Sequence, residues 1–245
     1  MIESNGNIIL NGCSFVEGNL DVPESTLSYH LEAITGKPII NLGKSGANNE
    51  RIFRTTFNFL EENQIRDSFI VIGLTHWARF ELYDEGLDKY HSFNFWDNSL
   101  LKGLEMVINY NNTKYLEYEF KFALIKNPNF KKYFSTYTKQ ELIKAIMFYL
   151  TIIKNKKAEV NKIKRELILL ESYCEKFNNK LFYFNSLECL PNLDKENYIK
   201  IGDQTCWYDY IEKQNMKDDI FTNHPNSQSN KQVANLIKNS FEIYN

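Results

Sequence analysis

Four short stretches of the chain carry the residue types that acyl transfer needs: a nucleophile, donors for an oxyanion and a base. Ser14 follows an apolar run that ends at Asn11. Gly46 follows a second apolar run, Thr75 follows a third, and His224 stands just before a final helical pattern. A glycine lets a backbone N–H approach a ligand closely, and a hydroxyl adds a further donor. The pattern therefore predicts a site where a serine, activated by a histidine, attacks a carbonyl carbon.

Apolar runs that alternate with helical patterns would position these residues. Four runs are rich in Ile, Val, Leu or Phe, as strands buried on both faces are: 7–11, 38–42, 68–73 and 180–185. Apolar residues at helical spacing follow over 49–63 and over 226–244. This alternation indicates βαβ units and a parallel sheet. Because ligands bind at the carboxyl ends of the strands in such sheets, the candidate residues are expected at one edge.

Ser14, Asn48 and Asn49 each have a second interpretation, as helix caps. Serine and asparagine that follow a turn commonly accept a hydrogen bond from the first turn of a helix. Asn49 is otherwise a candidate substrate contact. Cys13 adjoins the site, but its place at the end of a strand favours a side chain that points into the protein.

His76 and Arg79 follow the third strand closely and are further candidates for substrate binding. For Arg79 the competing interpretation is a solvated ion pair with Glu81, which would contribute little.

The four stretches resemble the sequence blocks of the SGNH hydrolases, also called the GDSL-type esterase/lipase superfamily. NGCSF resembles the first block, with Ser14 as the nucleophile, and NLGKSGANN the second, with Gly46 as the oxyanion glycine. IGLTHW stands in the place of the third block, and NHPN matches the His-Pro part of the fifth, with His224 as the base. The resemblance extends from Ile8 to about Ile237. It implies an α/β fold, a three-layer α/β/α sandwich with a flavodoxin-like parallel sheet, and ester hydrolysis without a metal or cofactor.

Three positions depart from the family's pattern. Cys13 stands where the family has an aspartate. Thr75 replaces an asparagine, so the oxyanion hole would consist of the Thr75 hydroxyl and the backbone N–H groups of Ser14 and Gly46. Phe221 occupies the place of the aspartate three residues before the histidine. Asp219 or Asp218 would then orient the imidazole through a longer loop; otherwise a backbone carbonyl would orient it in a Ser-His dyad.

A long insertion, at about 76–179, is expected within a single domain of residues 1–245. Its first half is aromatic, which suits stacking on sugar rings or packing in a core or lid. Its second half, 138–178, has helical spacing, but one continuous helix would be about 60 Å long, longer than such a domain is wide. We therefore predict a break near 155–157 that gives two core helices, or a projecting arm through which copies of the chain associate as a homo-oligomer.

Charge and composition exclude several partners. The chain has 29 Lys and Arg against 31 Asp and Glu, so no positive field favours nucleic acid or an anionic membrane. The scattered cysteines, without a CxxC pair, suit reduced thiols. No signal peptide or membrane span is evident, which predicts a cytoplasmic protein.

Other ligands find little support in the sequence. His30 and His91 have no partner at metal-ligand spacing, so no metal site is expected. No glycine-rich phosphate loop follows a strand, which argues against nucleotide binding.

The predicted function is a serine esterase acting on a small-molecule or saccharide ester, with O-acetyl groups on carbohydrate as a candidate substrate. The alternative is a catalytically weakened carbohydrate-binding or assembly protein of the same fold.

Overall fold

The computed structural model describes residues 6–77, 79–84, 89–93, 156–191, 193, 195–202, 206–218 and 224–243. They belong to two compact units, one formed by Met1–Trp77 with Val160–Asn245 and the other by Ala78–Glu159. The second unit lies within the insertion predicted at about 76–179, but the chain from Val160 onward belongs to the first unit. A single domain with an insertion stays a prediction.

The first unit is built on a parallel sheet with the strand order β2-β1-β3-β6. Its strands are β1 (Ile8–Asn11), β2 (Ile39–Asn41), β3 (Phe69–Leu74) and β6 (Lys180–Asn185). β1 pairs in parallel with both β2 and β3, and β3 with β6. This order matches the flavodoxin-like arrangement, in which the chain reverses its direction of winding next to the first strand.

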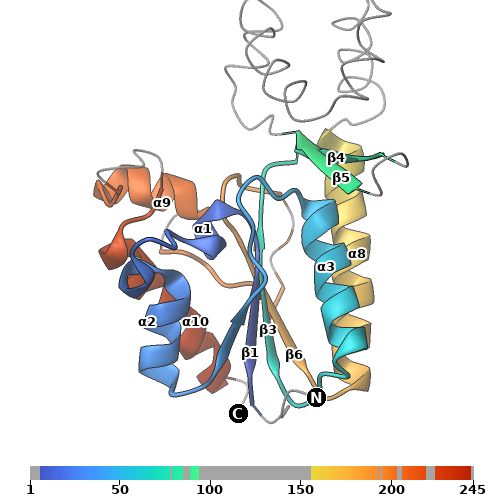
Figure 1. Ribbon diagram of the computed structural model, residues 1–245, viewed down its shortest axis with the longest axis horizontal. Helices are drawn as coiled ribbons and strands as arrows, with labels where there is room; N and C mark the ends of the chain where they lie inside the picture. Colours follow the sequence, from blue (N-terminus) through green and yellow to red (C-terminus); the bar gives the residue numbers. More distant parts are fainter. Residues whose placement is uncertain are drawn as a thin grey trace, which may run out of the picture. The chain divides into compact units, whose positions relative to one another are not determined.

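Helices cover both faces of this sheet. Figure 1 shows α1, α2, α9 and α10 on one side and α3 and α8 on the other. Their bounds are α1 (Ser14–Glu17), α2 (Leu27–Thr35), α3 (Asn49–Glu62), α8 (Lys156–Lys176), α9 (Trp207–Gln214) and α10 (Ser227–Ile243), with a 3-10 helix η1 (Pro23–Ser25) before α2. The layers confirm the predicted three-layer α/β/α sandwich.

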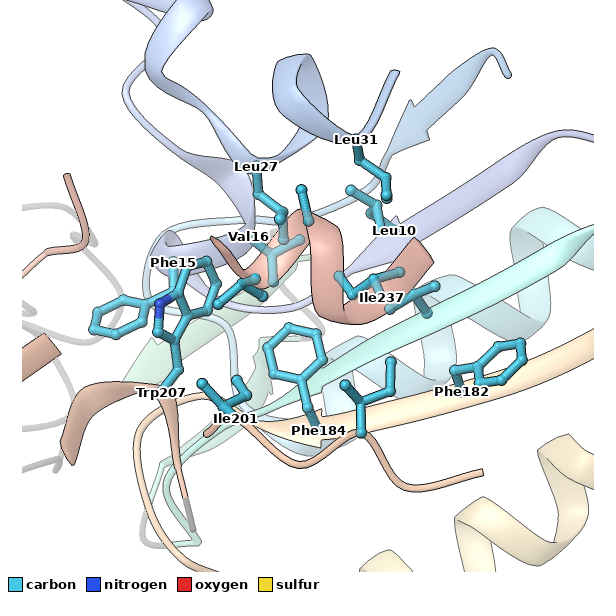
Figure 2. Close-up of a cluster of buried hydrophobic side chains, with 14 of the residues drawn as sticks. Leu10, Phe15, Val16, Leu27, Leu31, Phe182, Phe184, Ile201, Trp207 and Ile237 are labelled. Carbon is cyan, nitrogen blue, oxygen red and sulfur yellow. The ribbon is translucent and has the colours of Figure 1, made fainter. Parts of the chain in front are cut away.

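Two hydrophobic cores result from the alternation of side chains along the strands. Ile8 and Leu10 of β1 pack with α2, α9 and α10, whereas Ile9 packs with α3 and α8. The first core includes Phe15, beside the predicted nucleophile, and the fully buried Trp207 (Figure 2). Strands buried on both faces explain why the sequence shows nearly continuous apolar runs.

Several elements differ from those predicted from the sequence. In the second unit, β4 (Phe80–Asp84) and β5 (Lys89–Phe93) form an antiparallel pair, which the sequence analysis did not predict. α2, η1 and α9 were not predicted either. α8 accounts for the last part of the helical pattern at 138–178, and the rest of that pattern and most of the aromatic half lie outside the described residues. No helix in the described part of the chain is both long and apolar enough to cross a bilayer.

Candidate functional site

The turn after β1 presents Ser14 as the first residue of α1. Cys13 occupies the N-cap position without a side-chain capping bond and is buried. Ser14 is therefore not the cap of this helix, and its hydroxyl makes a different contact.

The side chain of Asn11 anchors this turn to α3. The Asn11 amide nitrogen donates to the Ile52 carbonyl at 2.9 Å and also lies 2.9 Å from the Thr56 hydroxyl, while its oxygen accepts from the Gly12 N–H at 2.9 Å. All of these groups are buried. Because buried polar groups that lose a partner are costly, these bonds fix the direction in which the chain leaves β1.

His224 is held by backbone pairing between two short segments. The Asp218 N–H donates to the His224 carbonyl at 2.8 Å, and the Asn226 N–H donates to the Met216 carbonyl at 3.0 Å. Lys217 and Pro225 form an antiparallel bridge between these bonds. The position of His224 is therefore set by main-chain hydrogen bonds at His224 itself and two residues later, at Asn226.

The structure brings Ser14 and His224 together. The His224 Nε2 atom and the Ser14 hydroxyl oxygen are 2.9 Å apart, within hydrogen-bonding distance, although 210 positions separate the residues in the sequence. This is the distance expected between a nucleophile and its general base.

Aromatic packing supports the same pair from one side. The Phe15 ring lies 5.5 Å from the Trp207 ring in an edge-to-face arrangement and 5.5 Å from the His224 ring, measured between centroids. The Trp207 indole N–H donates to the Ser229 hydroxyl at 2.8 Å. The residue next to Ser14 thus packs between α9 and the imidazole, which limits how far either can move.

Gly46 lies in a tight turn after β2. The Ala47 N–H donates to the Lys44 carbonyl at 2.9 Å, and Gly46, the third residue of the turn, has a φ of 77°. A type II turn requires this left-handed backbone at its third residue, where glycine is favoured. Among the described residues, no acceptor takes the N–H of Gly46 or that of Ser14, so both donors remain available to a ligand.

Asn49, predicted as a substrate contact or cap, bonds the backbone of Thr75. Its amide nitrogen donates to the Thr75 carbonyl at 3.0 Å, and its oxygen accepts from the Thr75 N–H at 2.9 Å. Asn48 is the N-cap of α3, since its side-chain oxygen accepts from the Arg51 N–H at 2.7 Å. Asn49 is 7% exposed, and its amide bonds both backbone groups of Thr75. As a substrate contact Asn49 stays a prediction.

The hydroxyl of Thr75 is the remaining polar group at the end of β3. Thr75 is fully buried, and no group in the described ranges bonds its hydroxyl. Unpartnered buried hydroxyls are uncommon and need an explanation.

His76 and Arg79 are the other residues predicted to contact a substrate. His76 Nε2 lies 3.3 Å from a carboxylate oxygen of Glu188, and the His76 ring stacks on Trp77 with centroids 5.8 Å apart. Arg79 precedes β4 in the second unit and is buried with Glu81, which is not expected of a solvated pair. As substrate contacts His76 and Arg79 stay predictions.

The predicted orienting acid, Asp219, and the neighbouring Phe221 lie outside the described residues. Asp218 is described, and its backbone N–H bonds the His224 carbonyl as given above. An acid that orients the imidazole stays a prediction.

Glu17, which lies in α1 close to Ser14, is not among the residues predicted from the sequence. One carboxylate oxygen of Glu17 accepts from the Ser45 N–H at 2.6 Å, and the other accepts from the Lys44 ammonium at 3.0 Å. Burial alone would raise the pKa of Glu17, but the hydrogen bonds from Ser45 and Lys44 outweigh burial and hold that pKa below its usual value. An acidic residue in the first turn of a helix was the only sequence signal.

Two of the cysteines are unsuited to act as nucleophiles near neutral pH. The four cysteines are free. Burial raises the pKa of the Cys174 and Cys206 thiols to about 12, so neither is a thiolate near neutral pH. No cluster of three or more His, Cys, Asp or Glu in the ranges given above is arranged to hold a metal ion.

Comparisons with known proteins give a distant structural likeness. No family model and no curated protein matches the chain. The psychrotrophic esterase EstA from Pseudoalteromonas sp., in a structure inhibited by monoethylphosphonate, aligns with 98% of both chains at 12% identity and a TM-score of 0.45. A protein described as lipolytic and of the G-D-S-L family, from Desulfitobacterium hafniense DCB-2, aligns with 96% of this chain and 99% of its own at 12% identity and a TM-score of 0.35. The protein YXIM from Bacillus subtilis aligns with 98% of this chain and 57% of its own at 10% identity and a TM-score of 0.46. Likeness at this level says nothing about the activity of the chain.

Proposed function

We propose that this chain is a serine hydrolase of the SGNH type that cleaves an ester, with Ser14 as the nucleophile and His224 as the general base. The observation that carries the proposal is the 2.9 Å contact between Ser14 Oγ and His224 Nε2, made by two residues from opposite ends of the sequence. Both residues are also the ones that the resemblance of NGCSF and NHPN assigns to these roles.

The proposed reaction has two halves. His224 Nε2 takes the hydroxyl proton of Ser14 while Ser14 Oγ forms a bond to the ester carbonyl carbon. The tetrahedral intermediate collapses, His224 returns the proton to the leaving alcohol, and the acyl group stays on Ser14. Water, deprotonated by His224, then attacks the acyl carbon and forms a second tetrahedral intermediate. As this intermediate collapses, His224 returns the proton to Ser14 Oγ, which releases the acid and regenerates the enzyme.

Three donors are proposed for the oxyanion: the backbone N–H groups of Ser14 and Gly46 and the hydroxyl of Thr75. The support is that none of these donors has an acceptor among the described residues. Donors that are already in place stabilise the developing charge without reorganising, and removing one typically lowers the rate by about 10²–10³.

Two finer features belong to the same proposal. Asp219, or Asp218 in its place, orients the imidazole of His224; an orienting carboxylate raises the rate by orders of magnitude.

The substrate is a small acyl ester, with O-acetyl groups on a saccharide as the first class to examine. The aromatic residues of the insertion motivate that choice, with His76 and Arg79 as candidate contacts.

The test is labelling with a fluorophosphonate probe, read by intact mass and peptide mapping, on the wild type, Ser14→Ala and His224→Ala. We expect one adduct, on Ser14, that is lost in both variants. Ser172→Ala is a matched control, because Ser172 lies in α8 with its hydroxyl donating to the Ile168 carbonyl of the same helix, and it should label like the wild type. No adduct on folded wild-type protein, beside a labelled control esterase, would contradict the proposal and favour a binding or assembly protein.

Hydrolysis of p-nitrophenyl acetate and release of acetate from acetylated saccharides then separate the two parts of the proposal. Activity on the simple ester without activity on any acetylated saccharide would contradict the saccharide substrate alone.

A further inference from the structure

We infer that Glu17 is a positioning residue, whose carboxylate holds the turn that carries Gly46 against the helix that begins at Ser14. The inference rests on the proposed function, because it concerns the oxyanion donors of the same site.

Besides the ion pair between Lys44 and Glu17, three hydrogen bonds tie the end of β2 and the loop that follows it to the nucleophile turn and α1. The Lys44 N–H donates to the Gly12 carbonyl at 3.0 Å, and the Asn41 amide nitrogen donates to the Val16 carbonyl at 2.7 Å. The third tie is the bond from the Ser45 N–H to the Glu17 carboxylate. The first two ties lie at Asn41 and Lys44, whereas the bond of Glu17 reaches Ser45, next to Gly46.

The loop also approaches α1 too closely for any side chain at Gly43. A Cβ at Gly43 would lie 2.7 Å from the Glu17 nitrogen and 3.1 Å from the Val16 carbonyl carbon. Because the two backbones lie this close, the Glu17 carboxylate can reach the Ser45 N–H.

The geometry of the turn explains why this bond matters for the donors. In the turn from Lys44 to Ala47, the internal hydrogen bond uses the N–H of Ala47 only. The N–H groups of the two central residues, Ser45 and Gly46, are left to partners outside the turn. The Glu17 carboxylate accepts a hydrogen bond from the Ser45 N–H. The Gly46 N–H is then the donor left for a ligand. The same bond fixes the peptide plane between Lys44 and Ser45, which is next to the peptide that carries the Gly46 N–H.

Glu17 is suited to this role by its environment. Its side chain is 12% exposed, whereas that of Lys44 is 59% exposed. The exposed ion pair with Lys44 contributes little by itself. The bond to Ser45 is a charge-assisted hydrogen bond to a backbone donor, which is stronger and better defined in direction.

The experiment compares Glu17→Ala, Glu17→Gln and Lys44→Met with the wild type. Steady-state hydrolysis of p-nitrophenyl acetate gives kcat and KM for each, and circular dichroism verifies that each is folded. Glu17→Ala is expected to lower kcat about tenfold or more with KM within about twofold, since an oxyanion donor acts mainly in the transition state. Glu17→Gln keeps an acceptor for Ser45 and should restore most of kcat, and Lys44→Met should resemble the wild type.

Amide hydrogen exchange of Ser45 provides a readout that does not depend on activity. Ser45 should exchange slowly in the wild type and in Glu17→Gln and at least tenfold faster in Glu17→Ala. Equal exchange in all three, an unchanged kcat in Glu17→Ala, or equal losses in Glu17→Ala and Glu17→Gln would overturn the inference while the wild type remains active. A wild type that neither hydrolyses the ester nor takes the fluorophosphonate label would instead overturn the proposed function, and this inference with it.

Discussion

The side chain of Asn49 bonds both backbone groups of Thr75, accepting from its N–H at 2.9 Å and donating to its carbonyl at 3.0 Å. The first residue of α3 thereby bonds both backbone groups of the residue just beyond β3. An amide is the side chain that can both donate and accept in this way. The contact joins the helix after Gly46 to the strand that carries the third proposed oxyanion donor.

Asn49→Ala should lower the free energy of unfolding by about 1–3 kcal/mol, because it leaves a buried N–H and a buried carbonyl without partners. Urea denaturation measures the change. The matched control is Asn58→Ala, at an exposed position of the same helix, which should change stability by less than about 0.5 kcal/mol. Equal effects of the two substitutions would show that the Thr75 contact is not stabilising.

Thr75→Val should separate activity from stability. If the Thr75 hydroxyl is an oxyanion donor, its removal lowers kcat for p-nitrophenyl acetate by about tenfold to a thousandfold. Because the hydroxyl is buried without a partner among the described residues, valine should leave the free energy of unfolding unchanged or raise it by about 1 kcal/mol. A loss of stability without a change in kcat would contradict the assignment.

Trp207 and Ser229 should show energetic coupling. Trp207→Phe leaves the Ser229 hydroxyl without its donor, and Ser229→Ala leaves a buried indole N–H unsatisfied. Each substitution should cost about 1–3 kcal/mol, and the double variant should lose less than the sum of the two. Chemical denaturation of the four proteins measures the coupling, and additive losses would refute it.

Glu17 should make stability depend on pH. Its folded pKa is below the usual value of 4.5, so its contribution is fully present above about pH 4.5 and is lost as the pH falls through the folded pKa. Glu17→Gln should therefore be less stable than the wild type at pH 7, with the difference shrinking below pH 4.5. Urea denaturation at pH 7 and at progressively lower pH tests this, and a difference that does not change with pH would contradict it.

Much of the fold follows from local patterns. β1, β3 and β6 were predictable because they are buried on both faces and are therefore mostly apolar, as in Phe69–Leu74, where every residue is buried. β2 is only partly buried, but its two isoleucines belong to the apolar run at 38–42. α3 was predictable from its apolar stripe and its capping asparagine. α9 was not, because Trp207–Gln214 is only eight residues long and buries few of them.

The site was predictable in its residue types but not in its support. Ser14, Gly46 and His224 stand beside strand or helix ends, where motifs are visible in the sequence. The bonds of Glu17 to Ser45 and of Asn49 to Thr75 link loops that only the tertiary fold brings together. Asparagine after a turn indicates a cap as readily as a contact, so the role of Asn49 required the structure.

The separation of Ser14 and His224 by 210 positions has a consequence during synthesis of the chain. At about 5–20 residues per second, the ribosome produces His224 tens of seconds after Ser14. The nucleophile can be translated and the first strands formed while its base does not yet exist. Under the proposed function, a nascent or truncated chain that ends before residue 224 would be chemically silent, and reactivity would begin only once the last helix has docked.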